Sequence, residues 1–220
     1  MTDRRDEILD AALAIADDKG MGAVTMRAVA ARIGVTAMAL YPHVQSKDDL
    51  LEGLLGRLLA EISVPDPAKP WQDRGREFAR SARAAAHRHP AVLPLAFTRP
   101  GVTREVAVVV DAVYQLLLDA GVAPEQVARV ERMLSTFVVG YALSETGGRF
   151  AANERARLAM DPAAGFPAIA RLAPLLDTPW SRDEEFEADL DDLIVLIESI
   201  AVPSPGTPRE SRAPGRSVQR

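Results

Sequence analysis

The stretch TMRAVAARIGVTAMALYPHVQSK, residues 25–47, decides the fold of this chain. Its first half predicts a short helix, because Thr25 is a good N-cap and apolar residues then recur at helical spacing. Gly34 ends this helix, since glycine readily takes the left-handed conformation. Thr36 is a second N-cap candidate, and Pro42 limits the next helix to residues 37–43. Two short helices around a glycine turn indicate a helix-turn-helix unit.

The flanking residues complete a three-helix unit with a fourth helix attached. An apolar helical stripe precedes the unit: Ile8, Ala11, Ala12 and Ile15. Downstream, Ser46 and Asp49 have the spacing of a capping box at the start of a helix that we expect to reach Ser63. A helix N-terminus beside Lys47 suits a DNA phosphate.

The second short helix is the candidate for the major groove of DNA. Ala37 and Ala39 are small enough for the backbone to approach base edges, while Met38, Tyr41 and His43 project toward thymine methyls and phosphates. The alternative is an ordinary helical domain, which shows similar caps. The order and lengths of turn, cap and final helix favour DNA binding.

Residues 5–59 resemble the DNA-binding domain of the TetR (tetracycline repressor) family of transcription regulators. The shared residues are Thr25, Arg27, Ala30, Gly34, Val35, Leu40, Tyr41, His43, Val44, Lys47, Leu50 and Leu51. The resemblance implies that Arg27 and residues 37, 38 and 41–43 meet DNA, with Tyr41 and Lys47 on phosphates. The complete set of candidate DNA-binding residues is Thr25, Arg27, Thr36, Ala37, Met38, Leu40, Tyr41, His43 and Lys47.

Composition indicates a cytoplasmic protein. The 220 residues contain no cysteine, no apolar run of membrane-spanning length and no N-terminal signal pattern. The net charge of −5 argues against nucleic-acid binding, for which a basic domain is usual. Acidic residues can face away from the duplex, so we expect a salt-sensitive complex with few phosphate contacts.

Helical patterns dominate the remainder and predict an all-α fold. The expected helices cover residues 71–87, a short piece between Pro90 and Pro94, and residues 105–119, 124–150, 168–176 and 182–201. These patterns predict three parts: a DNA-binding domain over 1–62 that includes the linking helix 46–62, a helical ligand-binding and dimerisation domain over 63–202, and a disordered tail over 203–220.

Two long helices with apolar faces, 124–150 and 182–201, suggest a homodimer held by a four-helix bundle. The alternative is that both faces pack within their own domain. DNA recognition favours the dimer, because a symmetric pair reads two half-sites of a palindromic operator.

The second domain resembles the C-terminal domain of the tetracycline repressor subgroup at residues 71–73, 97–100 and 137–140. In that subgroup the drug enters as a magnesium chelate held by histidines and a carboxylate. This chain departs at the corresponding positions, which hold Ser63, Phe78, Leu95, Thr136 and Ser144. Magnesium requires oxygen ligands that leucine cannot supply. We therefore expect no metal, no cofactor and no tetracycline–magnesium binding.

A largely apolar ligand cavity is the remaining expectation. The candidate ligand-binding residues are Ser63, Phe78, Leu95, Phe97, Thr98, Arg99, Asp111, Thr136, Phe137 and Tyr141. Each aromatic residue among them can equally be ordinary core. Arg99 either caps a helix C-terminus or meets an anionic ligand.

An enzyme is not expected. His87 and His89 precede Pro90 at a helix end without a third metal ligand, and there is no catalytic triad or phosphate-binding glycine loop. The sequence predicts a repressor that binds operator DNA and is released by a small, largely apolar effector that moves the linking helix. A ligand-independent regulator or activator, and a helical protein-interaction module, remain alternatives.

Overall fold

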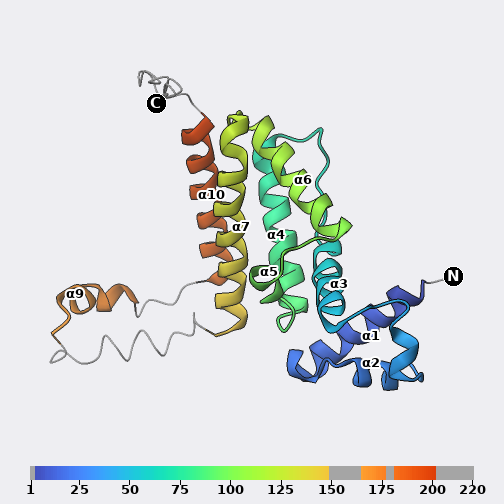
Figure 1. Cartoon of the computed structure of the whole chain (residues 1–220). Helices are drawn as coiled ribbons and strands as arrows, with labels where there is room; N and C mark the ends of the chain where they lie inside the picture. The colour runs from blue at the N-terminus through green and yellow to red at the C-terminus, as the bar shows by residue number, and fades with distance from the viewer. Residues whose placement is uncertain (1–2, 149–164, 177–180, 202–220) are drawn as a thin grey trace, which may run out of the picture.

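The computed structural model describes residues 3–148, 165–176 and 181–201, and every regular element in these ranges is helical (Figure 1). The α-helices are α1 (Arg4–Lys19), α2 (Met26–Arg32), α3 (Lys47–Ala60), α4 (Trp71–Arg88), α5 (Leu95–Thr98), α6 (Arg104–Asp119), α7 (Pro124–Thr146), α9 (Pro167–Leu176) and α10 (Arg182–Ala201). The predicted all-α fold is confirmed. No helix among the described residues is long and apolar enough to cross a membrane.

Several helix bounds differ from the sequence prediction, and the helix expected to reach Ser63 ends at Ala60. The second short helix is a 3₁₀ helix over Ala37–Leu40 rather than a helix over 37–43. No helix forms between Pro90 and Pro94, where the chain turns, and α5 begins only after Pro94. Helix α7 ends at Thr146, because the two glycines that follow stop it and Gly148 has a φ of 74°. Residues 149–150 and the expected tail over 203–220 lie outside the described residues.

The N-terminal unit has a core shared by α1, α2, the 3₁₀ helix and α3. Its largest fully buried side chains are Ile8, Val24, Val29, Leu40, Val44, Leu50 and Leu54. The same cluster continues into the larger unit through Ala85, Val92 and Ala142. The two units are therefore joined by a continuous apolar contact rather than by a linker alone.

The larger unit is a bundle in which α4, α6, α7 and α10 lie side by side (Figure 1). Helix α4 contacts α6, α7 and α10, and α6 contacts α7. One apolar cluster at one end of the bundle includes Leu117, Val130 and Ile197. A second contains Tyr141 and Phe186, whose ring centroids are 5.1 Å apart.

Helix α3 belongs to both units. It contacts α1 in the N-terminal unit and α4, α5 and α6 in the bundle. Its first turn directly follows residues 25–46, the helix-turn-helix stretch that we call the reading segment, and its last turns approach the bundle interior. A displacement of α3 therefore moves the N-terminal unit relative to the bundle.

Candidate DNA-reading surface and ligand cavity

The reading segment is held by the backbone chemistry that its sequence predicts. The Oγ1 atom of Thr25 accepts a hydrogen bond of 3.1 Å from the Ala28 N–H, which caps α2. Gly34 has a φ of 74°, the left-handed conformation that only glycine adopts at little cost. Thr36 occupies the N-cap position of the 3₁₀ helix without a side-chain hydrogen bond. Its hydroxyl is thus not used for capping and lies on the exposed surface.

The candidate DNA-binding residues lie mostly at the surface. Met38 is 74% exposed and Tyr41 is 42% exposed. Thr25, Arg27, Thr36, His43 and Lys47 are also exposed, and Ala37 is partly buried. Leu40 is a correction, because its side chain is 1% exposed and packs in the core of the N-terminal unit. It positions the 3₁₀ helix and does not reach DNA.

Ion pairs within the N-terminal unit neutralise several acidic residues. Arg5 donates to both carboxylate oxygens of Asp49, at 2.6 and 3.2 Å, and these hydrogen bonds lower the pKa of Asp49. Asp49 also accepts from the Gln45 N–H at 2.9 Å, so its carboxylate fixes the entry into α3. The Ser46 Oγ atom accepts from the Asp49 N–H at 3.1 Å, which confirms Ser46 as the helix cap.

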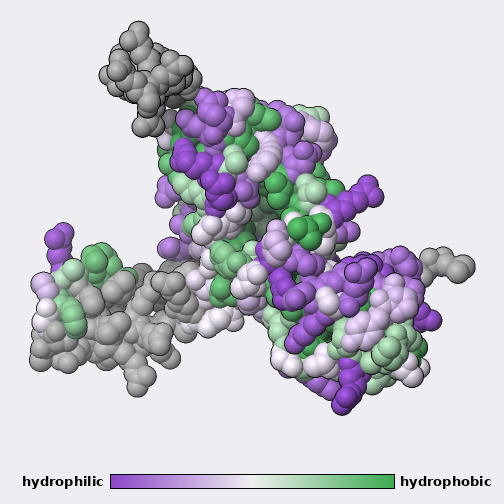
Figure 2. Space-filling model, in the orientation of Figure 1, coloured by the Kyte–Doolittle hydropathy of each residue, from purple (hydrophilic) through white to green (hydrophobic). Residues whose placement is uncertain are grey.

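Arg27 and Lys47 have no ion pair or side-chain hydrogen bond with any residue that the structure describes. Arg4, Arg5, Arg32 and Arg57 of the same unit each pair with an acid. Figure 2 shows hydrophilic and hydrophobic residues interspersed on the visible face of this unit. Lys19, in the last turn of α1, is also without an ion pair among the described residues. Arg27 and Lys47 lie within residues 25–47, and they are therefore the cations available for phosphates there.

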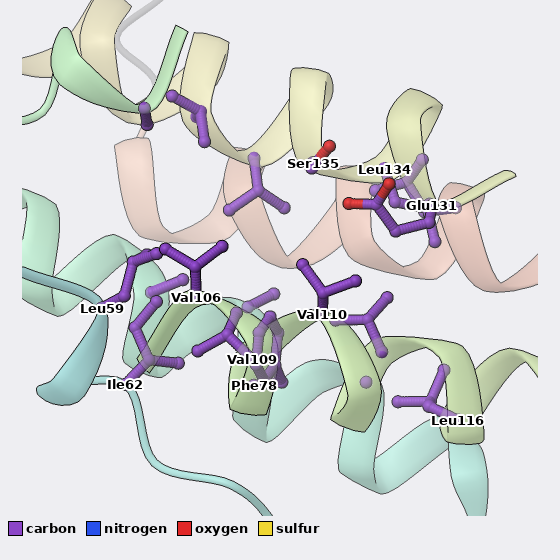
Figure 3. Close-up of a pocket in the computed structure, with 18 of the residues that line it drawn as sticks. Leu59, Ile62, Phe78, Val106, Val109, Val110, Leu116, Glu131, Leu134 and Ser135 are labelled. Carbon is purple, nitrogen blue, oxygen red and sulfur yellow. The ribbon is translucent and has the colours of Figure 1, made fainter. Parts of the chain in front are cut away.

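A cavity of about 290 Å³ lies within the larger unit, close to the lower end of the size range of small-molecule sites. Its wall draws on α3, α4, α5, α6, α7 and α10. Aliphatic residues supply most of the wall, as the close-up in Figure 3 shows: Leu59, Ile62, Val106, Val109, Val110, Leu116 and Leu134. The charged side chains on the wall are Arg76, Arg99 and Glu131.

Two of the ten candidate ligand-binding residues, Phe78 and Arg99, line this cavity. The other eight lie outside its wall: Ser63, Leu95, Phe97, Thr98, Asp111, Thr136, Phe137 and Tyr141. Leu95 belongs to the shared core, and Phe97 is 49% exposed. Tyr141 packs on Phe186 and donates to the Arg182 carbonyl at 3.3 Å.

Helical geometry explains this difference on α7. Successive residues on a helix point about 100° apart, so Phe137 and Val138 face different neighbours. Glu131, Leu134 and Val138 share the stripe that faces the cavity. On α6 the wall residues Val106, Val109, Val110 and Val113 were not among the predicted ligand-binding residues. Their i, i+3, i+4, i+7 spacing marks a single helix face and was the available signal.

Arg99 is the C-cap residue of α5, which is one of the two roles expected for it, and its backbone N–H donates to the Leu95 carbonyl at 2.9 Å. Its Nη1 atom donates to the Asp48 carboxylate at 2.8 Å, and Asp48 lies in the first turn of α3. The positive charge of Arg99 is therefore already paired inside the protein. This leaves the cavity without a free arginine for an anionic ligand on this side.

The two histidines before Pro90 bind carboxylates. His89 is 9% exposed and bridges Asp17 of α1 and Glu61 after α3, at 2.9 and 2.8 Å. His87 contacts Glu145 at 3.0 Å, and Arg83 contacts the same carboxylate at 2.6 Å. No cluster of three or more metal-ligating side chains exists among the described residues. Glu145, which follows Ser144, is thus engaged in an ion-pair network.

Comparison with known proteins gives two family matches. Residues 8–54 match "Bacterial regulatory proteins, tetR family", and residues 64–199 match "Tetracyclin repressor-like, C-terminal domain". The tetracycline repressor protein class A from transposon 1721 of Escherichia coli is 32% identical over 203 residues, which cover 88% of each chain. An HTH-type transcriptional regulator of Saccharopolyspora erythraea is 29% identical over 182 residues, 80% of this chain and 77% of that one.

The fold also matches a solved structure over nearly its full length. The TetR family protein ActR of Streptomyces coelicolor, in complex with actinorhodin, superimposes with a TM-score of 0.78 at 30% identity. The match covers 91% of this chain and 99% of ActR. Actinorhodin is a ligand of that protein, and the likeness extends through both the N-terminal unit and the bundle that holds the cavity here.

Proposed function

Because this chain belongs to the TetR family of transcriptional regulators, we propose that it is a repressor released from its operator by a small, largely apolar effector. The family consists of DNA-binding regulators rather than enzymes. One observation of the structure supports the coupling between ligand and DNA, beyond what family membership implies. Helix α3 starts beside the reading segment, and Leu55 and Leu59 near its other end form part of the cavity wall.

The coupling follows from this shared helix. A molecule that fills the cavity presses on Leu55 and Leu59, and α3 responds as a rigid element because Ser46 and Asp49 fix its other end. The reading segment precedes that end directly, so a tilt of α3 re-aims the 3₁₀ helix. An effector released in this way must bind the DNA-free conformation better than the DNA-bound one, and it weakens DNA binding by the same factor.

The repressor acts as a homodimer on a palindromic operator. Val195 and Leu196 of α10 are 63% and 39% exposed, which is unusual for large apolar residues on a bundle helix. A second copy packed on α7 and α10 covers them and brings two reading segments to successive half-sites. Few side chains of each copy reach base edges, so the spacing between the two half-sites adds selectivity.

Two measurements test the proposal. Fluorescence anisotropy with DNA from upstream of the protein's own coding region should give a salt-sensitive, sequence-selective complex at nanomolar to micromolar protein. Analytical ultracentrifugation should give a dimer on one operator. Failure to bind any sequence selectively removes the repressor proposal, and a monomer on the operator removes the dimer.

A second pair of variants separates a ligand-dependent repressor from a ligand-independent regulator. Val110→Phe fills the cavity from α6, and Val108→Phe adds the same ring on an exposed part of the same helix. The proposal expects Val110→Phe alone to change operator affinity, because the added ring takes the space of an effector. Equal operator affinity in both variants and the wild type supports a regulator in which the cavity plays no part.

A further inference from the structure

The carboxylate of Glu131 points into the cavity from α7. Figure 3 shows it extending between α7 and Val110 of α6, close to Leu134 and Ser135. Among the described residues it is the one acidic side chain of the cavity wall, whose other members are mostly aliphatic. Its position is fixed by the stripe of α7 that also carries Leu134 and Val138 into the wall.

The basic residues of the same wall are already neutralised. Arg76 pairs with Asp191 of α10 at 2.7 Å, and Arg99 pairs with Asp48 of α3 at 2.8 Å. Both acids lie outside the wall, and each balances the charge of one arginine that lines the cavity. The wall therefore offers an anionic ligand no free cation among the described residues.

Glu131, in contrast, has no hydrogen bond or ion pair with any residue that the structure describes. Glu131 is partly buried, and a carboxylate placed against aliphatic side chains loses part of its hydration, which none of the described residues replaces. A cationic ligand group restores the lost interaction through charge-assisted hydrogen bonds. Water can solvate the carboxylate while the cavity is empty, but an apolar ligand without a donor expels that water and leaves the charge unpaired.

We propose that the effector carries a protonated amine on an otherwise apolar body, and that Glu131 binds the ammonium group. The inference rests on the proposed function, in that it specifies the ligand of the same cavity. An ammonium has three N–H donors, and the two carboxylate oxygens of Glu131 can accept hydrogen bonds from two of them. Ser135 lies one turn further along the same face. Its hydroxyl donates to the Arg132 carbonyl at 3.3 Å, so its oxygen can take part in a further hydrogen bond only as an acceptor.

The test uses three compounds with the same apolar cage: adamantan-1-amine, adamantan-1-ol and adamantane-1-carboxylate. They are cationic, neutral and anionic at pH 7, and isothermal titration calorimetry gives their affinities for the full chain without DNA. We expect the amine to bind about tenfold tighter than the alcohol, and the carboxylate to bind weakest, because one charge-assisted pair is gained or one repulsion is added.

Glu131→Gln should reduce the preference for the amine over the alcohol to about twofold or less, since the amide retains the shape but carries no charge. Glu125→Gln is the matched control: it removes the same charge from an exposed position of the same helix outside the wall and should keep the wild-type preference. Circular dichroism establishes that both variants are folded. The wild-type ranking of the three compounds tests the proposal even if the Glu131 variant does not fold.

The proposal is overturned if the alcohol or the carboxylate binds as well as the amine, if none of the three binds, or if the Glu131→Gln variant retains the preference. These outcomes are separable from failure of the proposed function. A protein without selective DNA binding would remove the repressor proposal, and the ranking of the three compounds, measured without DNA, would still decide the role of Glu131.

Discussion

The guanidinium of Arg99 and the carboxylate of Asp48 form a 2.8 Å ion pair that joins the cavity wall to the first turn of α3. The Arg99 side chain is 21% exposed and that of Asp48 is 80% exposed, so water competes strongly for the pair. Asp48 directly follows Lys47, the candidate phosphate contact. A weak ion pair at this place is compatible with a conformational change, because it favours one position of α3 but breaks at little cost in free energy.

The first prediction concerns the strength of this tie. Arg99→Gln and Asp48→Asn, alone and combined in a double-mutant cycle, should show a coupling free energy below about 1 kcal/mol in urea unfolding, as exposed ion pairs do. The same variants should change operator affinity more than stability, because they release the start of α3. A coupling free energy near 3 kcal/mol would contradict this prediction and would mean that the pair contributes strongly to stability.

The helix-turn-helix could be predicted from sequence because each of its determinants is local. A cap, a glycine with positive φ and a proline act within a few residues, and the structure retains Thr25 and Ser46 in these roles. Leu40 was misassigned for a related reason. Its neighbours in the family pattern face outward, but only the packing of three helices shows that residue 40 points into the core.

The cavity could not be predicted to the same extent. Its wall draws on six helices, so it depends on how they pack, and one sequence window shows only the stripe of a single helix. The family pattern pointed to Leu95, Phe97, Thr98, Arg99, Thr136 and Phe137, and of these six residues only Arg99 lines the cavity. The bridging role of His89 was equally hidden, because Asp17 and Glu61 are distant in sequence.

Leu40 and Met38 provide a matched pair for the reading segment. Leu40→Ala should lower the free energy of unfolding by about 2–5 kcal/mol, because it removes a fully buried side chain. Met38→Ala should leave stability nearly unchanged and weaken operator binding, since this side chain is 74% exposed. Urea unfolding and fluorescence anisotropy measure the two quantities. If the Leu40→Ala protein were as stable as the wild type but did not bind the operator, Leu40 would be a DNA contact and the correction would be wrong.

The Arg83–Glu145 pair should contribute far more than the surface pairs. The side chain of Glu145 is fully buried, and Arg83 also lies 4.6 Å from the ring centroid of Phe186. Arg83→Ala leaves a buried charge with a weaker partner and should cost about 3 kcal/mol or more of stability. Arg80 lies on α4, as Arg83 does, and forms an exposed ion pair with Glu187 of α10. Arg80→Ala breaks this pair and should cost less than about 1 kcal/mol of stability. Equal losses in urea unfolding would contradict this difference.

The same network sets the response to acid. Burial of Glu145 favours its protonated form, but hydrogen bonds from Arg83 and His87 outweigh burial and lower its pKa. A carboxyl with a lowered folded-state pKa contributes stability that is complete above its unfolded pKa, about 4.3, and is lost as pH falls through the folded value. Stability measured from pH 7 to pH 3 should therefore decline, and less steeply in Glu145→Gln. Burial raises the pKa of Asp189, so this residue acts in the opposite direction.

The last prediction concerns the unpaired cations of the reading surface. If Arg27 and Lys47 each neutralise one phosphate, Arg27→Ala or Lys47→Ala should reduce the slope of log affinity against log salt by about 0.9 per monomer. The loss should be similar for different operator sequences, because a phosphate contact carries no base information. Lys69→Ala is the control: it removes a cation that pairs with Glu77 at the start of the bundle and should leave the slope unchanged. If all three variants gave the same slope, only the overall charge of the chain would matter. A change confined to Arg27 and Lys47 would locate the duplex beside the 3₁₀ helix, with the N-terminus of α3 on its backbone.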